Sequence, residues 1–366
     1  MTRFLSQLAA SLPATVPFVG PEAEERASAR PFRARLGANE SLFGPSPLAA
    51  QAMQTAISEV WMYGDPENHD LKAAIAAHHG LTPAHVVVGE GIDGLLGYLA
   101  RLTVEPGTPV TTSLGAYPTF NFHVTGYGGH LHRVPYAGWH EDPQALMDHA
   151  RASGSKLIYL ANPDNPMGSH HPGTVIEEMI ANLPETSLLV LDEAYVELAP
   201  QGTAARVVPD DPRVIRLRTF SKAYGMAGAR VGYALAEPSL AKAFDKVRNH
   251  FGMGRVVQAG ALVALSDHDH LTRIRALTLT ARHQLSAIAR DNGLSPLPSA
   301  TNFVTLDCGR DAAYARALLA ALIGLGIFVR MPGVAPLDRC IRVSLGDAPA
   351  MEALAEALPQ AIKTLG

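Results

Sequence analysis

The chain has 366 residues, of which 47% are hydrophobic and 17% are charged, and its net charge is −4. This is the composition of a soluble globular protein, and the length predicts one large domain accompanied by a smaller one. Because the sequence contains no basic run, it argues against binding to nucleic acid or to an anionic membrane surface. Two cysteines are too few for a disulfide scaffold, so we expect a cytoplasmic protein.

The N-terminal segment, residues 1–40, is rich in proline and lacks the clean apolar stretch of a signal peptide, so we expect an arm. We assign residues 41–245 to a large α/β domain and residues 246–366 to a small α+β domain, part of which the arm completes. The longest apolar run, residues 317–329, is too short to span a bilayer. Its two glycines predict the end of a helix, a turn and a strand.

Four short apolar runs in the large domain are each followed by a polar turn. The runs are residues 86–88, 156–160, 187–191 and 214–217. Helix-like stretches separate them, and this alternation predicts a mostly parallel sheet covered by helices. Ligands of such sheets bind at the carboxyl ends of the strands, so the four turns together predict a binding site.

The first turn, residues 89–94, reads Gly-Glu-Gly-Ile-Asp-Gly, which matches the G-x-G-x-x-G pattern of dinucleotide-binding proteins. That pattern expects an acidic residue about 20 positions later, but residues 113–116 read Ser-Leu-Gly-Ala. A glycine-rich turn that begins a helix still presents main-chain N–H groups and a positive dipole to a phosphate. We therefore predict a phosphate site at this turn and reject a dinucleotide.

The second turn, residues 162–168, reads Asn-Pro-Asp-Asn-Pro-Met-Gly. Two successive Asx-Pro turns make a rigid loop, from which Asn165 could direct its amide to a ligand hydroxyl. Elsewhere in a protein this would be a common turn, and its position at the predicted sheet edge is what indicates a site.

The third turn, residues 192–195, reads Asp-Glu-Ala-Tyr. A carboxylate at a buried strand end needs a cationic partner, and a protonated pyridine nitrogen could be that partner for Asp192. Tyr195 could hydrogen-bond a ring oxygen. Taken alone, an Asp-Glu pair at a strand end is more often a loop or a helix cap.

The fourth turn leads into residues 218–233 and contains one lysine, Lys222, among small residues. Desolvation in such a pocket disfavours the ammonium form, and the neutral amine is a nucleophile. With Thr219 and Ser221, Arg230 would offer a guanidinium and two hydroxyls to a phosphate. The alternative interpretation of this stretch is a surface lysine and a structural arginine.

After about residue 240 the pattern changes to long Ala/Leu-rich stretches, residues 240–247 and 271–289, with strand-like runs at 302–306 and 341–345. These elements predict the small α+β domain. Among the 15 histidines, the doublets at 78–79 and 170–171 lack metal-ligand spacing and no His-Glu-x-x-His occurs, so we expect no metal site.

The four turns, in this order, resemble those of the fold-type I pyridoxal-phosphate aminotransferases, specifically the histidinol-phosphate aminotransferase-like branch. Residues 36–47 resemble the N-terminal signature of that branch, residues 63–66 its Tyr-Pro motif and residues 340–346 its carboxylate-binding strand. The resemblance extends over nearly the whole chain. It implies a three-layer, mostly parallel sheet in a large cofactor-binding domain, with pyridoxal phosphate as the cofactor.

The resemblance also implies roles for individual residues. Lys222 would join the cofactor through a Schiff base, with Asp192 at the pyridine nitrogen and Tyr195 at the ring oxygen. The other residues expected at the cofactor are Gly91, Ile92, Asp93, Asn165, Thr219, Ser221, Arg230, Tyr63 and Phe120, with Tyr117 as the alternative to Phe120 for stacking on the ring.

Four residues are expected at the substrate. Arg342 would bind the α-carboxylate and Arg330 the distal group, with Asn39 beside them. Tyr63 would reach the site of the neighbouring subunit, which implies a homodimer with shared active sites.

The activity implied is transamination between a small-molecule amino donor and a 2-oxo acid, with L-histidinol phosphate and 2-oxoglutarate as the expected pair. An aromatic or other amino-acid aminotransferase and a phosphothreonine decarboxylase of the same branch are the alternatives. A cofactor-binding regulatory domain without turnover is a further alternative. The complete set of Lys222, Asp192 and Arg342 argues against it, as does the lack of a basic DNA-binding segment.

Overall fold

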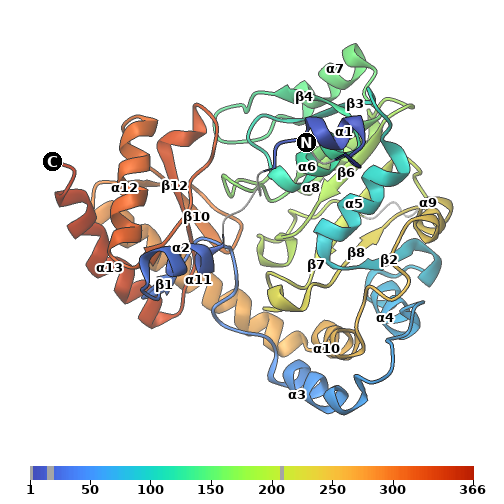
Figure 1. Cartoon of the computed structure of the whole chain (residues 1–366), viewed down its shortest axis with the longest axis horizontal. Helices are drawn as coiled ribbons and strands as arrows, with labels where there is room; N and C mark the ends of the chain where they lie inside the picture. Colours follow the sequence, from blue (N-terminus) through green and yellow to red (C-terminus); the bar gives the residue numbers. More distant parts are fainter. Residues whose placement is uncertain (1–2, 15–19, 207–209) are drawn as a thin grey trace.

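A seven-stranded sheet forms the centre of the larger part of the molecule in this computed structural model, which describes residues 3–14, 20–206 and 210–366 (Figure 1). In spatial order its strands are β2 (Val86–Gly89), β8 (Gly232–Leu235), β7 (Val214–Thr219), β6 (Leu188–Asp192), β5 (Leu157–Ala161), β3 (Pro109–Ser113) and β4 (His130–Val134). The last five of these are parallel, whereas β8 runs antiparallel to both β7 and β2.

The central strands are buried on both faces. β5 and β7 are buried at every residue, as expected for parallel strands covered by helices on each side. Alternate residues enter separate clusters: Tyr159 packs with α5 and α6, whereas Ile158 and Leu160 pack with α7 and α8. The large part therefore has three layers, with the sheet in the middle.

Of the helices of the large part, α3 and α4 precede the sheet in sequence and the others lie between or after its strands. Their bounds are α3 (Pro47–Ala56), α4 (His69–His79), α5 (Gly91–Thr103), α6 (Pro118–Gly126), α7 (Pro143–Ser153), α8 (Gly173–Ala181), α9 (Pro238–Ala243) and α10 (Arg255–Ser266). α3 packs along α10 at one end of the molecule (Figure 1). Two short N-terminal helices are α1 (Gln7–Ser11) and α2 (Pro21–Ser28).

The smaller part contains two small sheets and three long helices. The antiparallel sheet has the order β12 (Cys340–Ser344), β10 (Phe303–Asp307) and β9 (Ser295–Pro296), and β1 (Ala34–Arg35) pairs in parallel with β11 (Ile327–Phe328). The helices are α11 (His268–Asp291), α12 (Ala312–Gly324) and α13 (Ala348–Lys363). Because β1 comes from the N-terminal segment, the arm completes the core of this part.

The structure confirms the predicted α/β class and its mostly parallel sheet. Each of the four predicted strands lies within two residues of an observed one, and the run at 317–329 is the end of α12, a turn and β11. In the described part of the chain, no helix has both the length and the apolar character needed to cross a bilayer. The boundary proposed between residues 245 and 246 stays a prediction.

Candidate active site

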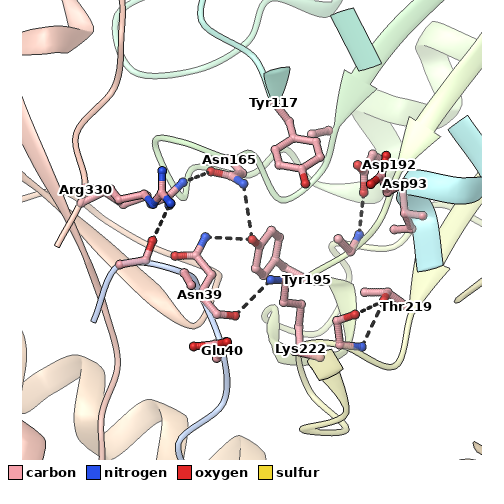
Figure 2. Close-up of a pocket in the computed structure, with 18 of the residues that line it drawn as sticks. Asn39, Glu40, Asp93, Tyr117, Asn165, Asp192, Tyr195, Thr219, Lys222 and Arg330 are labelled. Carbon is pink, nitrogen blue, oxygen red and sulfur yellow. Dashed lines mark hydrogen bonds between the residues drawn. The ribbon is translucent and has the colours of Figure 1, made fainter. Parts of the chain in front are cut away.

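A cavity of about 430 Å³ lies at the carboxyl ends of β5, β6 and β7. The large part contributes the start of α5 and the loops that follow these strands. The smaller part contributes residues 37–40, Arg330 and Arg342. Side chains from both parts point into the same space (Figure 2). This is the edge at which the sequence predicted a site.

Lys222 follows β7, and its side chain lies in the cavity wall (Figure 2). Its Nζ donates a hydrogen bond to the main-chain oxygen of Asn39 at 3.0 Å and lies 5.7 Å from the centre of the Tyr195 ring. Burial lowers the pKa of Lys222 to about 8, and the charges of Arg342 and Arg230 act in the same direction. A large fraction of the amine is therefore neutral near that pH, and the neutral amine is the form that attacks a carbonyl carbon.

Asp192 ends β6 and is buried in the cavity wall. Its Oδ2 accepts a hydrogen bond from the hydroxyl of Tyr159 at 2.7 Å, and its Oδ1 accepts one from the main-chain N–H of Ala194 at 2.9 Å. Burial raises the pKa of Asp192, although these two bonds and the charge of Lys222 oppose the rise. A cation placed against this carboxylate would stabilise the ionised form.

Tyr195 is held by two amides. Its hydroxyl oxygen accepts hydrogen bonds from Nδ2 of Asn39 at 3.0 Å and from Nδ2 of Asn165 at 3.5 Å (Figure 2). Since the oxygen is the acceptor in both bonds, its own proton remains available to a ligand oxygen. Asn165 in turn accepts a hydrogen bond from Arg342 through its Oδ1.

The start of α5 and the loop after β7 form a cradle of hydrogen-bond donors. Gly91 begins α5 with a φ of +76°, and a Cβ there would lie 2.5 Å from Nη2 of Arg230. Arg230 donates to Oγ of Ser221 at 3.3 Å, and Thr219 donates to the same oxygen at 2.9 Å. A guanidinium, two hydroxyls and a helix start are the kinds of group that bind a phosphate.

Ile92 and Asp93 continue the same turn and line the cavity. The carboxylate of Asp93 lies 2.7 Å from Nε2 of His123 on α6, and this hydrogen bond lowers the pKa of Asp93. The aspartate side chain thus has a partner on α6, outside the cradle.

Two arginines face the cavity from the smaller part. The main-chain N–H of Arg330 bonds to the main-chain oxygen of Arg342 at 3.2 Å, and the reverse bond is 2.6 Å long. Because the two residues are direct antiparallel partners, their side chains share a face. Arg342 also donates to the main-chain oxygen of Gly37 at 3.0 Å, and its buried Nε has no hydrogen-bond partner within the described chain. Burial lowers the pKa of both arginines, so an anionic ligand would relieve the cost of burying these charges.

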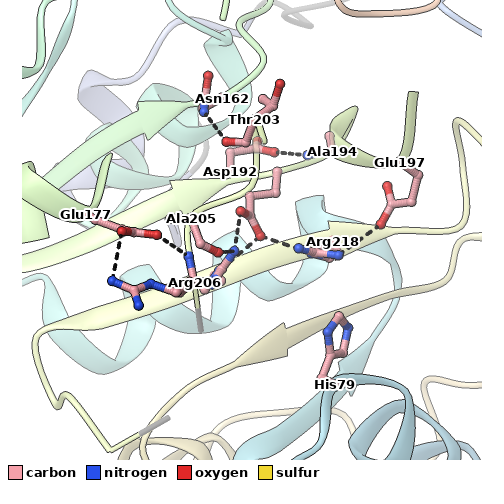
Figure 3. A network of polar contacts seen from close by, with 12 residues as sticks. His79, Asn162, Glu177, Asp192, Ala194, Glu197, Thr203, Ala205, Arg206 and Arg218 are labelled. Carbon is pink, nitrogen blue, oxygen red and sulfur yellow. Dashed lines mark hydrogen bonds and ion pairs between the residues drawn. The ribbon is translucent and has the colours of Figure 1, made fainter. Parts of the chain in front are cut away.

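A buried ion-pair network lies directly behind Asp192 (Figure 3). Glu193 accepts hydrogen bonds from Arg216 at 2.6 and 3.1 Å and from Arg218 at 3.0 Å. Arg218 also pairs with Glu197 at 3.5 Å. These side chains are at most 11% exposed, so their charges are screened little by water.

Three predicted residues do not line the cavity: Gly91, although its neighbour Ile92 does, Phe120 and Tyr63. Phe120 is buried in the core and stacks on Tyr159 with the ring centres 4.5 Å apart, whereas Tyr117 lines the cavity. The geometry therefore favours Tyr117, the alternative, for the ring-facing position. Tyr63 is 76% exposed and contacts Phe251 with the ring centres 4.5 Å apart.

Some contacts at the site were not predicted. Tyr159 stands within an apolar strand-like run, but its buried hydroxyl needs a hydrogen-bond partner, and that partner is Asp192. Nδ2 of Asn302 donates to the main-chain oxygen of Asn39 at 2.9 Å, and this is the same oxygen that accepts the hydrogen bond of Lys222. Residues 20–22, at the start of α2, also line the cavity, and no local signal distinguishes them from the rest of the arm.

The family model for aminotransferase class I and II matches residues 34–358. The chain belongs to this family. Its solved relatives include a histidinol-phosphate aminotransferase from Sinorhizobium meliloti in complex with pyridoxal-5'-phosphate, which is 54% identical. That alignment covers 100% of this chain and 99% of the relative, with a TM-score of 0.97.

Curated relatives of this aminotransferase give the same family. The histidinol-phosphate aminotransferase 1 of Mesorhizobium japonicum is 33% identical over 322 residues, which is 86% of each chain. The histidinol-phosphate aminotransferase 2 of Ralstonia nicotianae is 35% identical over 89% of each chain. The resemblance inferred from the four turns is thereby confirmed.

Proposed function

We propose that this aminotransferase uses pyridoxal phosphate to transfer the amino group of L-histidinol phosphate to 2-oxoglutarate. The observation that supports the choice of substrate is the pair of adjacent arginines, Arg330 and Arg342, in a cavity that also contains a phosphate cradle and a reactive lysine.

The residues present fit pyridoxal phosphate. Because Gly91 has no side chain, the guanidinium of Arg230 fits beside it in the phosphate cradle. A side chain at residue 91 would fill the space that this guanidinium occupies. The raised pKa of buried Asp192 suits a carboxylate that faces a protonated pyridine nitrogen. The free proton of Tyr195 suits the ring oxygen. Thr219 and Ser221 would assist Arg230 at the phosphate, and Tyr117 would cover one face of the ring.

When bound, the cofactor's protonated ring accepts the electron pair that is released as a proton leaves the substrate Cα. Asp192 holds the ring nitrogen in its protonated form, because its carboxylate is stable in this buried position only beside a positive charge. Nζ of Lys222 would take the proton from the substrate Cα and hold it for return, a role that requires an amine that titrates near neutral pH. Tyr195 would hold the ring oxygen, and Arg342 and Arg330 would hold the anionic groups of the substrate.

The arginine pair suits both substrates of the proposed reaction. A phosphate monoester carries close to two negative charges at neutral pH, and 2-oxoglutarate presents a carboxylate to the same position. Bidentate binding by guanidinium groups is favourable for both anions. One recognition site therefore serves the amino donor in the first half-reaction and the acceptor in the second.

The test is an absorbance spectrum of the cofactor-loaded protein before and after adding L-histidinol phosphate without an oxo acid. We expect the visible band of the lysine-bound cofactor to disappear, and we expect L-histidinol, which lacks the phosphate, to act far more weakly. An equal response to the two compounds would refute the phosphate-binding role of the arginines. A response only to aromatic amino acids, or release of CO₂ from phosphothreonine, would identify one of the two alternative activities of this branch.

We also propose that the enzyme is a homodimer in which each subunit completes the other's site. Exposed apolar side chains lie on and shortly after α3, and they are Leu48, Ile57, Val60, Trp61 and Tyr63. The exposed ring of Phe251 contacts Tyr63. A cluster of this kind on a soluble enzyme supports a protein interface. Tyr63 does not line the cavity of its own chain, which is consistent with a role in the partner's cavity.

Mixing two weakened variants tests the shared site. Lys222→Ala and Tyr63→Ala each impair a different subunit's contribution, so a mixed dimer contains one site with both residues intact. We expect the mixture to recover roughly a quarter of wild-type activity from random pairing. No recovery in a mixture shown to exchange subunits would exclude a role for Tyr63 in the partner's site.

Cytoplasmic residence is proposed from the two buried, unpaired cysteines and is tested by cell fractionation.

A further inference from the structure

Glu141 is a fully buried acid at the carboxyl edge of the sheet, in the segment that leads from β4 to α7. Its Oε2 accepts a hydrogen bond from the hydroxyl of Ser113 at 2.6 Å, and its Oε1 accepts one from the main-chain N–H of Ala161 at 3.0 Å. Its main-chain oxygen is 2.8 Å from Nε2 of His171. Glu141 therefore joins the ends of β3 and β5, although it does not line the cavity itself.

The carboxyl group of Glu141 is also hydrogen-bonded to that of Asp164. Asp164 is buried as well, and it accepts hydrogen bonds from the hydroxyl of Tyr136 at 2.9 Å and from the main-chain N–H of Met167 at 2.9 Å. The main-chain N–H of Asp164 bonds to the main-chain oxygen of Ser169 at 2.8 Å. These bonds fix the shape of the loop at 162–168.

A proton is required between the two carboxyl groups. Neither group forms an ion pair with a basic residue within the described ranges. Two buried carboxylates in contact repel each other, so one of them holds a proton. Burial raises the pKa of Glu141 well above its ordinary value and that of Asp164 to about 6, so Glu141 keeps the proton. The other titratable groups around the pair are Tyr136, Tyr159, His140, His171 and Arg342.

The loop that this pair holds carries Asn165, which contacts both Tyr195 and Arg342 in the cavity. We propose that Glu141 is a positioning residue of this enzyme, acting as a neutral acid that fixes Asp164 and, through the loop, the amide of Asn165. The effect on catalysis rests on the function proposed above, because it needs the cofactor and substrate to contact Tyr195 and Arg342.

Two substitutions separate this role from simple core packing. In Glu141→Gln the amide can donate to Asp164 and to the oxygen of Ser113, while its oxygen still accepts from Ala161. We therefore expect cofactor affinity and kcat within about twofold of wild type. Glu141→Leu has a similar volume but no hydrogen bonds, so we expect kcat/KM to fall by about tenfold to a hundredfold, as small misplacements in a site can cause. The dissociation constant for pyridoxal phosphate, measured by titration, should rise by about tenfold in the leucine variant.

A second measurement tests the proton and does not need activity. Because the folded-state pKa of Glu141 is raised, its favourable contribution is complete below the ordinary value of 4.5 and is lost as the pH rises above it. The unfolding equilibrium constant of cofactor-free wild type should therefore increase relative to that of Glu141→Gln by up to about tenfold for each pH unit. Glu178→Gln, at an exposed glutamate on α8, is the matched control and should show no such change.

The outcomes are distinguishable. If wild type is active and Glu141→Leu matches it in cofactor affinity and turnover, the positioning role is wrong. If Glu141→Gln is impaired as strongly as the leucine variant, or its stability follows wild type at every pH, the neutral-acid assignment is wrong. If Glu141→Leu does not fold, the comparison of Glu141→Gln with wild type still decides whether Glu141 acts as a neutral acid. Failure of the wild-type protein to bind pyridoxal phosphate would overturn the proposed function and leave the stability comparison unaffected.

Discussion

The buried ion pairs behind Asp192 lead to a strong prediction for Glu193→Gln. Glu193 is the shared acceptor of Arg216 and Arg218, and its side chain is 2% exposed. The substitution replaces one acceptor oxygen with an amide N–H₂ group that faces a guanidinium donor. It also leaves two buried arginines with Glu197 as their remaining carboxylate (Figure 3).

The expected loss follows from this geometry. Removing one partner of a buried ion pair costs about 3–5 kcal/mol, because the remaining charge stays buried without compensation. At roughly 2 °C for each kcal/mol in a chain of this size, the melting temperature should fall by about 6–10 °C. The free energy of unfolding is measured by urea denaturation of the cofactor-free protein, with thermal unfolding as a second measurement.

A matched substitution and the pH dependence check the explanation. Glu356→Gln removes the same charge from an exposed pair with Arg33 and should cost no more than about 1 kcal/mol. Burial alone would raise the pKa of Glu193, but Arg218 and Arg216 outweigh it and lower that pKa. The contribution of Glu193 is therefore complete above its ordinary value of 4.5, and the difference between wild type and Glu193→Gln should shrink as the pH falls below that value. A loss of less than about 1 kcal/mol at pH 7 would show that the network does not stabilise the fold.

Three further predictions concern the cavity. The reaction of cofactor-free protein with pyridoxal phosphate, followed by absorbance, should accelerate from about pH 7 to about pH 9 as Lys222 loses its proton, and Lys222→Ala should give no visible band. Gly91→Ala forces a Cβ to within 2.5 Å of Arg230 at a φ of +76°, so the dissociation constant for pyridoxal phosphate should rise about tenfold or more. Gly324→Ala, at the exposed end of α12, meets no atom within 4 Å and should leave that constant unchanged. Arg342→Lys keeps the charge but loses the planar guanidinium, so steady-state kinetics should show KM for 2-oxoglutarate rising by at least about tenfold; an unchanged KM would exclude Arg342 from the substrate site.

The parts of the site that could be predicted are those governed by local sequence. Apolar strands followed by polar turns place Asp192 and Lys222 at the same edge of a parallel sheet, and the structure has them there. The glycine at 91 likewise follows from a turn that begins a helix. Each of these inferences depends on residues within one strand and the turn after it.

The choice between Tyr117 and Phe120 could not be predicted from local sequence. α6 begins at Pro118, so a shift of a few residues decides which aromatic ring faces the cavity and which faces the core. Glu141 shows the same limit. It stands in a polar segment that resembles an exposed loop, and only the packing of β3, β5 and the loop at 162–168 around it makes it buried. Such long-range contacts have no signature in a single sequence.

The two halves of the site meet at Asn39, which explains why the arm is part of the active site. Its main-chain oxygen accepts the hydrogen bond of Lys222, its Nδ2 donates to Tyr195, and its main-chain N–H donates to Oγ of Ser344, two residues after Arg342. It adopts a φ of +55°, a conformation that asparagine tolerates better than most residues. Because β1 holds this segment against β11, docking of the N-terminal strand brings the lysine of the large part and the arginine of the smaller part into one cavity. The site is therefore assembled by the tertiary fold, in which the pairing of β1 with β11 anchors the segment that carries Asn39.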